Sequence, residues 1–214
     1  MNTPLKEILT KNSVLPVIVI EDLADAIPLA SALVAGGLDV LEVTLRTEAA
    51  LEAVAEIKKA FPSILVGTGT VTNMKTLHDS LEAGADFMVS PGVTTELLRD
   101  AMSVGANLLP GAATPSEVMQ LLEHGYTYQK FFPAEAAGGV NMLKSIAGPI
   151  PQVTFCPTGG ITLETAPNYL ALNNVACVGG SWMISSNLVR DKQWQVIEDY
   201  AKSAAALQSL NTNF

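Results

Sequence analysis

The sequence predicts an α/β fold in which short strands alternate with longer helices. Apolar, β-branched runs recur about every 20 to 25 residues, and the segments between them are rich in Ala, Leu and Glu at helical spacing. Four of these segments end in similar phrases (LVAGGLD, LEAGAD, MSVGAN and LEHGYT), which place a glycine where a left-handed residue ends a helix. This repetition favours a closed (β/α)8 TIM barrel, although the strand count alone also permits an open sheet.

Eight strands and an N-terminal helix are expected along the chain. The helix is predicted within MNTPLKEILTKNS, and later helices should begin at Thr72, Thr94 and the capping-box sequence Thr114-Pro115-Ser116-Glu117. The strands are predicted at 15–20, 39–45, 64–67, 86–90, 107–110, 127–132, 152–156 and 174–178. Because 214 residues with 49% hydrophobic content can bury one sizeable core, a single domain over 1–214 is expected.

Charge and composition exclude several classes of partner. A formal net charge of −9 leaves no general basic surface for nucleic acid or an anionic membrane. No stretch approaches the roughly 18 apolar residues that span a bilayer, and the start does not resemble a signal peptide, so a cytoplasmic protein is expected. Cys156 and Cys177 lie in apolar runs and are predicted to be buried thiols, while His78 and His124 lack the spacing of metal ligands.

The predicted second strand carries an unusual polar face. Side chains alternate along a strand, so Glu42, Thr44 and Arg46 share one face, while the intervening leucines and valine face the helices. The polar face is therefore expected to point into the barrel, where a buried charge is costly unless a partner or a ligand compensates it. An internal ion pair is the purely structural alternative.

The predicted sixth strand places Lys130 and Phe132 on one face. Phe131, Phe132 and Pro133 give the lysine an apolar setting that disfavours its ammonium form, so it could act as a neutral nucleophile. The structural alternative is a solvated lysine at a strand end.

Two glycine pairs are expected just after the last two strands. They are Thr158-Gly159-Gly160 and Gly179-Gly180-Ser181, and each leaves backbone N–H groups unobstructed at the start of a helical segment. A single glycine pair usually marks only a tight turn. Two pairs at this end of a barrel favour a phosphate site.

Taken together, these motifs resemble those of the 2-keto-3-deoxy-6-phosphogluconate (KDPG) and 4-hydroxy-2-oxoglutarate (KHG) aldolases. LEVTLRT, GTGTV, SPG, KFFPAE, PTGGI and GGSW occur in the family's order over nearly the whole chain. The resemblance implies a (β/α)8 barrel, a homotrimer, and no metal or organic cofactor. It also implies site roles: Lys130 forms the Schiff base, Glu42 is the acid/base, Arg46 and Thr70 hold the substrate carboxylate, Pro91 and Phe132 shape the pocket, and Gly159, Gly160 and Ser181 receive the phosphate.

The expected activity is that of a class I aldolase. The resemblance implies cleavage of 2-dehydro-3-deoxy-6-phosphogluconate to pyruvate and glyceraldehyde 3-phosphate, and also of 4-hydroxy-2-oxoglutarate to pyruvate and glyoxylate. Two alternatives stay open: another phosphate-binding barrel enzyme, such as an epimerase, decarboxylase or synthase, and a non-catalytic sugar-phosphate-binding module. The stereochemistry at C4 of the substrate is not determined by the sequence.

Overall fold

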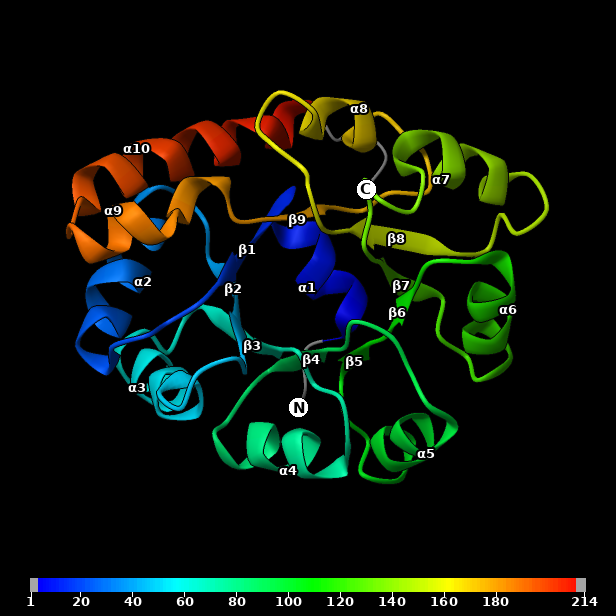
Figure 1. Cartoon of the computed structure of the whole chain (residues 1–214), viewed down its shortest axis with the longest axis horizontal. Coiled ribbons are helices and arrows are strands. Elements are labelled where there is room, and N and C mark those ends of the chain that lie inside the picture. Colours follow the sequence, from blue (N-terminus) through cyan, green and yellow to red (C-terminus); the bar gives the residue numbers. More distant parts are fainter. Residues whose placement is uncertain (1–3, 211–214) are drawn as a thin grey trace.

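Parallel strands with helices around them form the framework of the protein, which the computed structural model describes from residue 4 to residue 210 (Figure 1). The strands are β1 (Val14–Ile18), β2 (Val40–Thr44), β3 (Leu65–Gly69), β4 (Phe87–Val89), β5 (Leu108–Leu109), β6 (Gly111–Ala112), β7 (Tyr128–Phe131), β8 (Thr154–Pro157) and β9 (Val178–Gly180). The helices are α1 (Leu5–Lys11), α2 (Ala26–Ala35), α3 (Ala50–Ala60), α4 (Met74–Glu82), α5 (Thr95–Ser103), α6 (Pro115–Glu123), α7 (Gly139–Ala147), α8 (Ala166–Leu170), α9 (Ser186–Arg190) and α10 (Trp194–Ala205). Three 3-10 helices complete the order: η1 (Leu23–Asp25), η2 (Trp182–Ile184) and η3 (Ala206–Leu210).

The strands form two curled parallel sheets, whereas the sequence predicted one closed sheet of eight strands. One sheet has the order β5-β4-β3-β2-β1-β9 and the other has the order β6-β7-β8. The fifth strand, predicted at 107–110, is observed as β5, and a second short strand, β6, follows directly after Pro110. Leu109 of β5 pairs with β4, whereas Gly111 of β6 pairs with β7. On the other side, single bridges from Phe155 to Val175 and from Thr158 to Gly179 connect the second sheet to the β9 region. The predicted α/β class is confirmed, and the strands follow one another around a common interior (Figure 1).

The largest error in the predicted strands concerns the last one. It was expected at 174–178, but β9 begins at Val178 and includes the Gly179-Gly180 pair, which was expected in the following loop. In β9, Gly179 pairs with Leu15 and Gly180 pairs with Pro16 of β1. A Cβ atom on Gly179 would lie 2.2 Å from the Thr158 hydroxyl, and one on Gly180 would overlap the Trp182 ring. These glycines are therefore required by close packing within a strand.

A distinct apolar group fills the space enclosed by the strands. We call it the interior cluster; its buried members are Ile8, Leu9, Leu15, Val40, Phe87, Val89, Leu109, Cys156, Ala176 and Cys177. Leu15, Val40 and Phe87 lie at or near the starts of their strands, and Ile8 and Leu9 come from α1. The predicted N-terminal helix is therefore present, and it packs its apolar side into the enclosed space.

Most predicted helix signals are confirmed. Thr94 caps α5, and Thr114 with Glu117 forms the predicted capping box of α6. The start expected at Thr72 is displaced by one residue, because Asn73 is the N-cap of α4 and shares a capping box with Thr76. Each of the four repeated stop phrases contains one glycine with positive φ: Gly37, Gly84, Gly105 and Gly125.

Within residues 4–210, no helix combines the length and hydropathy needed to cross a bilayer. The same part of the chain contains no group of three or more His, Cys, Asp or Glu side chains arranged to hold a metal ion. Cys156 and Cys177 are free and buried, as predicted. A hydrogen bond with Cys156, together with burial, raises the pKa of the Cys177 thiol. Both cysteines belong to the interior cluster.

Candidate active site

A buried lysine and a buried glutamate face one another across the interior. Glu42 lies in the middle of β2 with 1% of its surface exposed, and Lys130 lies in β7 with 6% exposed. Lys130 Nζ is 3.6 Å from Glu42 Oε1, which is within ion-pair range but longer than a hydrogen bond. Neither carboxylate oxygen of Glu42 has a hydrogen-bond partner among the described residues. Because a buried charge is costly without hydrogen bonds, this pair can accept a polar ligand group.

The alternation predicted for β2 accounts for the position of Glu42. Leu41 and Val43 pack in the core between strands and helices, whereas Val40 belongs to the interior cluster. Glu42 and Thr44 are both buried, and Thr44 Oγ1 donates a hydrogen bond to Ile18 O at 2.9 Å. The threonine therefore ties β2 to β1, while the carboxylate of Glu42 stays unpaired apart from Lys130.

Gly69 leaves the space that the Glu42 carboxylate occupies. This glycine ends β3 and pairs with Thr44 of β2. A Cβ atom at Gly69 would lie 2.1 Å from Glu42 Oε1, so the carboxylate or the strand would have to move. The motif GTGTV contains Gly69, but the sequence analysis did not predict that this glycine makes room for Glu42. The position of a glycine at the end of a strand was the only local indication of it.

Arg46 lies beyond the buried part of the polar face, which ends with Thr44. Strand β2 ends at Thr44, so the strict alternation stops there, and Arg46 is exposed. Its Nε atom donates to Thr70 Oγ1 at 3.3 Å, which brings together the two residues expected to hold a carboxylate. Thr70 has φ of 64°, a left-handed conformation that non-glycine residues seldom adopt outside functional sites.

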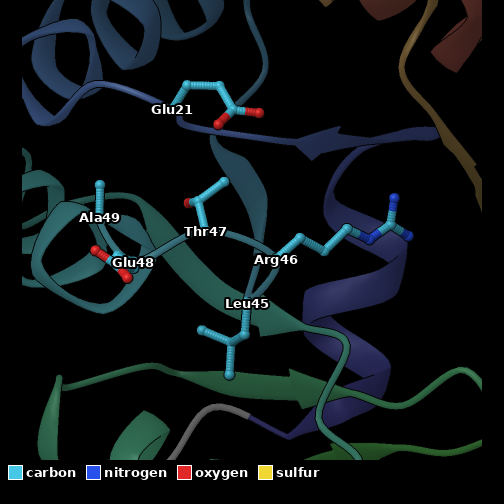
Figure 2. Close-up of a pocket in the computed structure, with 6 residues that line it drawn as sticks. All are labelled: Glu21, Leu45, Arg46, Thr47, Glu48 and Ala49. Carbon is cyan, nitrogen blue, oxygen red and sulfur yellow. The ribbon is translucent and has the colours of Figure 1, made fainter.

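Arg46 lines a shallow pocket of about 550 Å³ that contains neither Lys130 nor Glu42. Figure 2 shows its side chain extending away from the other lining residues, which are Glu21, Leu45, Thr47, Glu48 and Ala49. Thr47 Oγ1 donates to Ile20 O at 2.5 Å and so fixes the loop that follows β2. The guanidinium therefore projects from a well-anchored loop that follows β2, beside Thr70, which follows β3.

Phe132 lies beside the amine of Lys130, and Pro91 lies on the strand residue next to it. Lys130 Nζ lies 5.2 Å from the centroid of the Phe132 ring, within the range of a cation–π contact. The backbone of Pro91 packs directly on Gly111, where a Cβ would lie 2.4 Å from the proline carbonyl. Gly111 is in turn the register partner of Lys130. Gly111 of β6 therefore lies between Pro91 and Lys130.

The Gly159-Gly160 pair follows β8, as predicted, and both residues have positive φ, at 107° and 80°. A Cβ atom at Gly159 would be 3.4 Å from the Phe132 ring, so the pair lies next to the aromatic neighbour of Lys130. Ser181 follows β9 and is exposed at the edge of a cavity of about 750 Å³ that Val17 and Val19 also line.

Thr158 is a second residue that the site prediction omitted. It is 6% exposed, its backbone bridges to Gly179, and its hydroxyl fills the space above that glycine. The threonine therefore links the Gly159-Gly160 turn with the strand that leads to Ser181. The available signal was its place in PTGG, directly before the glycine pair.

The family of the protein follows from the extent of its sequence match. Residues 5–200 match the model of the KDPG and KHG aldolases, and these residues include every site position described above. The chain belongs to this family. The family assignment made from the motifs is confirmed.

Named relatives agree with this assignment. The chain is 48% identical over 201 residues to a 2-dehydro-3-deoxy-phosphogluconate aldolase of Pseudoalteromonas atlantica, covering 94% of each chain. It is 48% identical over 202 residues to the KHG/KDPG aldolase of Escherichia coli, covering 94% of this chain and 95% of the relative.

Solved structures of family members have the same fold. The KDPG aldolase of Legionella pneumophila superposes with a TM-score of 0.94 at 47% identity, over 96% of this chain and 100% of that one. That structure contains pyruvate captured as a covalent carbinolamine intermediate. A KDPG aldolase of Zymomonas mobilis superposes with a TM-score of 0.90 at 48% identity, over 95% of this chain and 97% of that one.

Proposed function

We propose that the protein is a class I aldolase that cleaves 2-dehydro-3-deoxy-6-phosphogluconate to pyruvate and glyceraldehyde 3-phosphate, with Lys130 as the Schiff-base amine. The observation that carries the proposal is the distance of 3.6 Å between Lys130 Nζ and Glu42 Oε1, two buried groups in the interior that the strands surround. Imine-based cleavage requires a nucleophile that reaches the keto carbon and a proton acceptor that reaches the hydroxyl two carbons away. The proposal includes cleavage of 4-hydroxy-2-oxoglutarate, which the name of the Escherichia coli relative supports.

The first steps use Lys130. Its neutral amine attacks the C2 ketone to give a carbinolamine, and loss of water then gives an iminium ion. The positive nitrogen accepts the electron pair released when the C3–C4 bond breaks. The carbinolamine of pyruvate in the Legionella pneumophila relative supports an amine nucleophile in this family.

Glu42 is proposed to move the protons. It removes the proton of the C4 hydroxyl, so that C4 leaves as the aldehyde while C3 remains in a pyruvate enamine. The carboxyl group then returns a proton to C3, and water releases pyruvate from Lys130. The two unpaired oxygens of Glu42 support this assignment, because they leave its hydrogen-bonding capacity for the substrate.

Arg46 and Thr70 are proposed to bind the substrate carboxylate. A guanidinium presents two parallel donors to both carboxylate oxygens, and the Thr70 hydroxyl holds it in place. Pro91 and Phe132 are proposed to form the apolar walls of the pocket around the reacting carbons. Phe132 has this position beside Lys130 Nζ.

Gly159, Gly160 and Ser181 are proposed to hold the phosphate. Positive φ at both glycines gives a turn whose backbone N–H groups can face one anion. A Zymomonas mobilis aldolase structure with 3-phosphoglycerate supports a phosphate-bearing ligand in this family. We expect kcat/KM to be higher for the phosphorylated substrate than for 4-hydroxy-2-oxoglutarate. Equal values would contradict the phosphate site.

The architecture proposed for the chain is a single (β/α)8 barrel over 1–214, with β5 and β6 counted as one interrupted strand. The bridges between the β8 and β9 regions support closure of the sheet. Residues 1–3 and 211–214 of this proposed domain lie outside the described part of the chain. A cytoplasmic homotrimer that needs no cofactor, as the family resemblance implies, is part of the proposal, and sedimentation of the purified protein tests the trimer.

Reductive trapping tests the mechanism. The protein is incubated with pyruvate and sodium borohydride, and its intact mass is measured before peptide mapping. We expect one pyruvate adduct on Lys130, its loss in Lys130→Met, and its retention in the surface control Lys202→Met. Absence of an adduct, or an adduct on a surface lysine, would contradict the proposal and favour another phosphate-binding barrel enzyme or a binding module.

A further inference from the structure

Tyr169 is a core side chain whose hydroxyl reaches the turn that follows the lysine strand. It lies on α8 with 1% of its surface exposed. The hydroxyl donates to Glu135 Oε1 at 2.5 Å. Burial, together with this hydrogen bond, raises the pKa of Tyr169 well above its usual range, so the hydroxyl remains a donor at any working pH. The chemistry of the Schiff base does not use either residue.

Glu135 makes contact with the glycine pair through its backbone and its side chain. The turn that carries Glu135 donates two backbone hydrogen bonds, from Ala134 N to Thr158 O at 2.8 Å and from Glu135 N to Gly159 O at 3.1 Å. The Cβ and Cγ atoms of Glu135 lie 2.9 and 2.8 Å from the place where a Cβ of Gly160 would be. The side chain of Glu135 therefore covers Gly160 closely.

The Tyr169 hydroxyl contacts the Glu135 turn from the far side of the loop that carries the glycine pair. The loop begins after β8 at Pro157 and ends where α8 begins at Ala166. Its first residues are hydrogen-bonded to the Glu135 turn, and its end is held to the same turn by Tyr169. Gly139, the first residue of α7, permits this contact, because a Cβ there would be 3.0 Å from the hydroxyl oxygen. Helices α7 and α8 lie on the same side of the molecule (Figure 1).

We propose that the hydrogen bond from Tyr169 to Glu135 is a positioning device for the phosphate end of the substrate. It holds the Glu135 side chain against Gly160 and so fixes the Gly159-Gly160 turn relative to the strand of Lys130. The inference rests on the proposed function, in which this turn receives the phosphate. Glu135 and Tyr169 are positioning residues, and they set the preference for a phosphorylated over an unphosphorylated 2-oxo acid.

The test removes the hydroxyl and compares two substrates. For Tyr169→Phe, we expect kcat/KM on the phosphorylated substrate to fall about tenfold, mainly through KM, while kcat/KM on 4-hydroxy-2-oxoglutarate changes by less than about twofold. Tyr126→Phe is the control, because it removes the hydroxyl of a half-buried tyrosine whose pKa is raised by burial alone. This control should leave the ratio of the two kcat/KM values unchanged.

Variants at Glu135 examine the other partner. Glu135→Gln keeps an oxygen that can accept from Tyr169 and should retain most of the preference, whereas Glu135→Ala should lose as much as Tyr169→Phe. The double variant Tyr169→Phe/Glu135→Ala should be no worse than either single variant, because both remove one interaction.

A purely structural role predicts a different result. In that case Tyr169→Phe would lower the melting temperature and reduce activity on both substrates equally, and the unchanged ratio would overturn the inference. Borohydride trapping of pyruvate on Lys130 separates this outcome from a failure of the proposed function. We expect Tyr169→Phe to trap pyruvate as wild type does, whereas a wild-type protein that traps none would overturn both proposals.

Discussion

Replacing Gly69 by alanine tests whether the position of the Glu42 carboxylate controls the reaction. The new Cβ would lie 2.1 Å from Oε1, the oxygen that faces Lys130. Real Cβ contacts are essentially never below 3.0 Å, so the carboxylate must retreat by about 0.9 Å or β3 must shift. Gly69 has no positive φ, so alanine suits its backbone and the effect is steric.

The size of the effect follows from this displacement. A misplacement of about 1 Å in a catalytic group can cost on the order of 100-fold in rate, which corresponds to about 2.7 kcal/mol of transition-state stabilisation. Overpacking of a core site costs about 1 to 3 kcal/mol of stability. We therefore expect Gly69→Ala to fold with a lower melting temperature and to lose about 100-fold in kcat.

The assay separates imine formation from cleavage. Pyruvate release is followed by a coupled lactate dehydrogenase reaction, and borohydride trapping reports the amine of Lys130. Gly148→Ala is the control, because a Cβ at this helix end meets nothing closer than Ser145 O at 3.9 Å. A folded Gly69→Ala protein that cleaves within about threefold of wild type would refute the reasoning that Glu42 must stay in place.

Three further changes have defined outcomes. Arg46→Lys should raise KM about tenfold with a smaller change in kcat, because an ammonium cannot donate two parallel hydrogen bonds to a carboxylate; an unchanged KM in steady-state kinetics would contradict its role. Thr114→Ala should lower the free energy of unfolding by about 1 kcal/mol in urea titration, since it removes the side-chain cap of α6. The hydrogen bond from Ala113 N, followed by bonds from Thr114, lowers the pKa of Glu117 below its usual 4.5. The ionised Glu117 therefore stabilises the folded state above pH 4.5, and this stabilisation is lost as the pH falls through the lower pKa of the folded state. Glu117→Gln should therefore be less stable than wild type at neutral pH and approach it as the pH falls below the lowered pKa of Glu117; a difference independent of pH would contradict this account.

Local sequence patterns predicted which helices and strands are present more accurately than the residues at which they begin and end. The capping box at Thr114 and the glycine helix stops depend on neighbouring residues, and the structure contains them. The burial of Glu42 followed from alternation in one strand. The same rule does not extend to the burial of Arg46, because it does not specify where a strand ends, and β2 ends two residues before Arg46. The end of a strand is decided by pairing with its neighbours.

Contacts between distant segments were not available from the sequence. Nothing local indicates that β5 and β6, on either side of Pro110, belong to two sheets, or that Gly179 and Gly180 pair with β1. The hydrogen bond from Tyr169 to Glu135 likewise joins an α8 residue to a turn that precedes α7. Each of these depends on how the sheets curl and how the helices pack against them.

The sequence by itself determined the α/β class, the repeated order of strands and helices, the family, and the inward direction of Glu42 and Lys130. These features are periodic or lie within short motifs, and side-chain direction in a strand is fixed by the backbone geometry of that strand. Only the tertiary structure decided that the carboxylate and the amine lie 3.6 Å apart, with Gly69 leaving space for one and Phe132 beside the other. That distance depends on the register and curvature of strands far apart in the chain, because cross-strand position is set by packing around a shared interior.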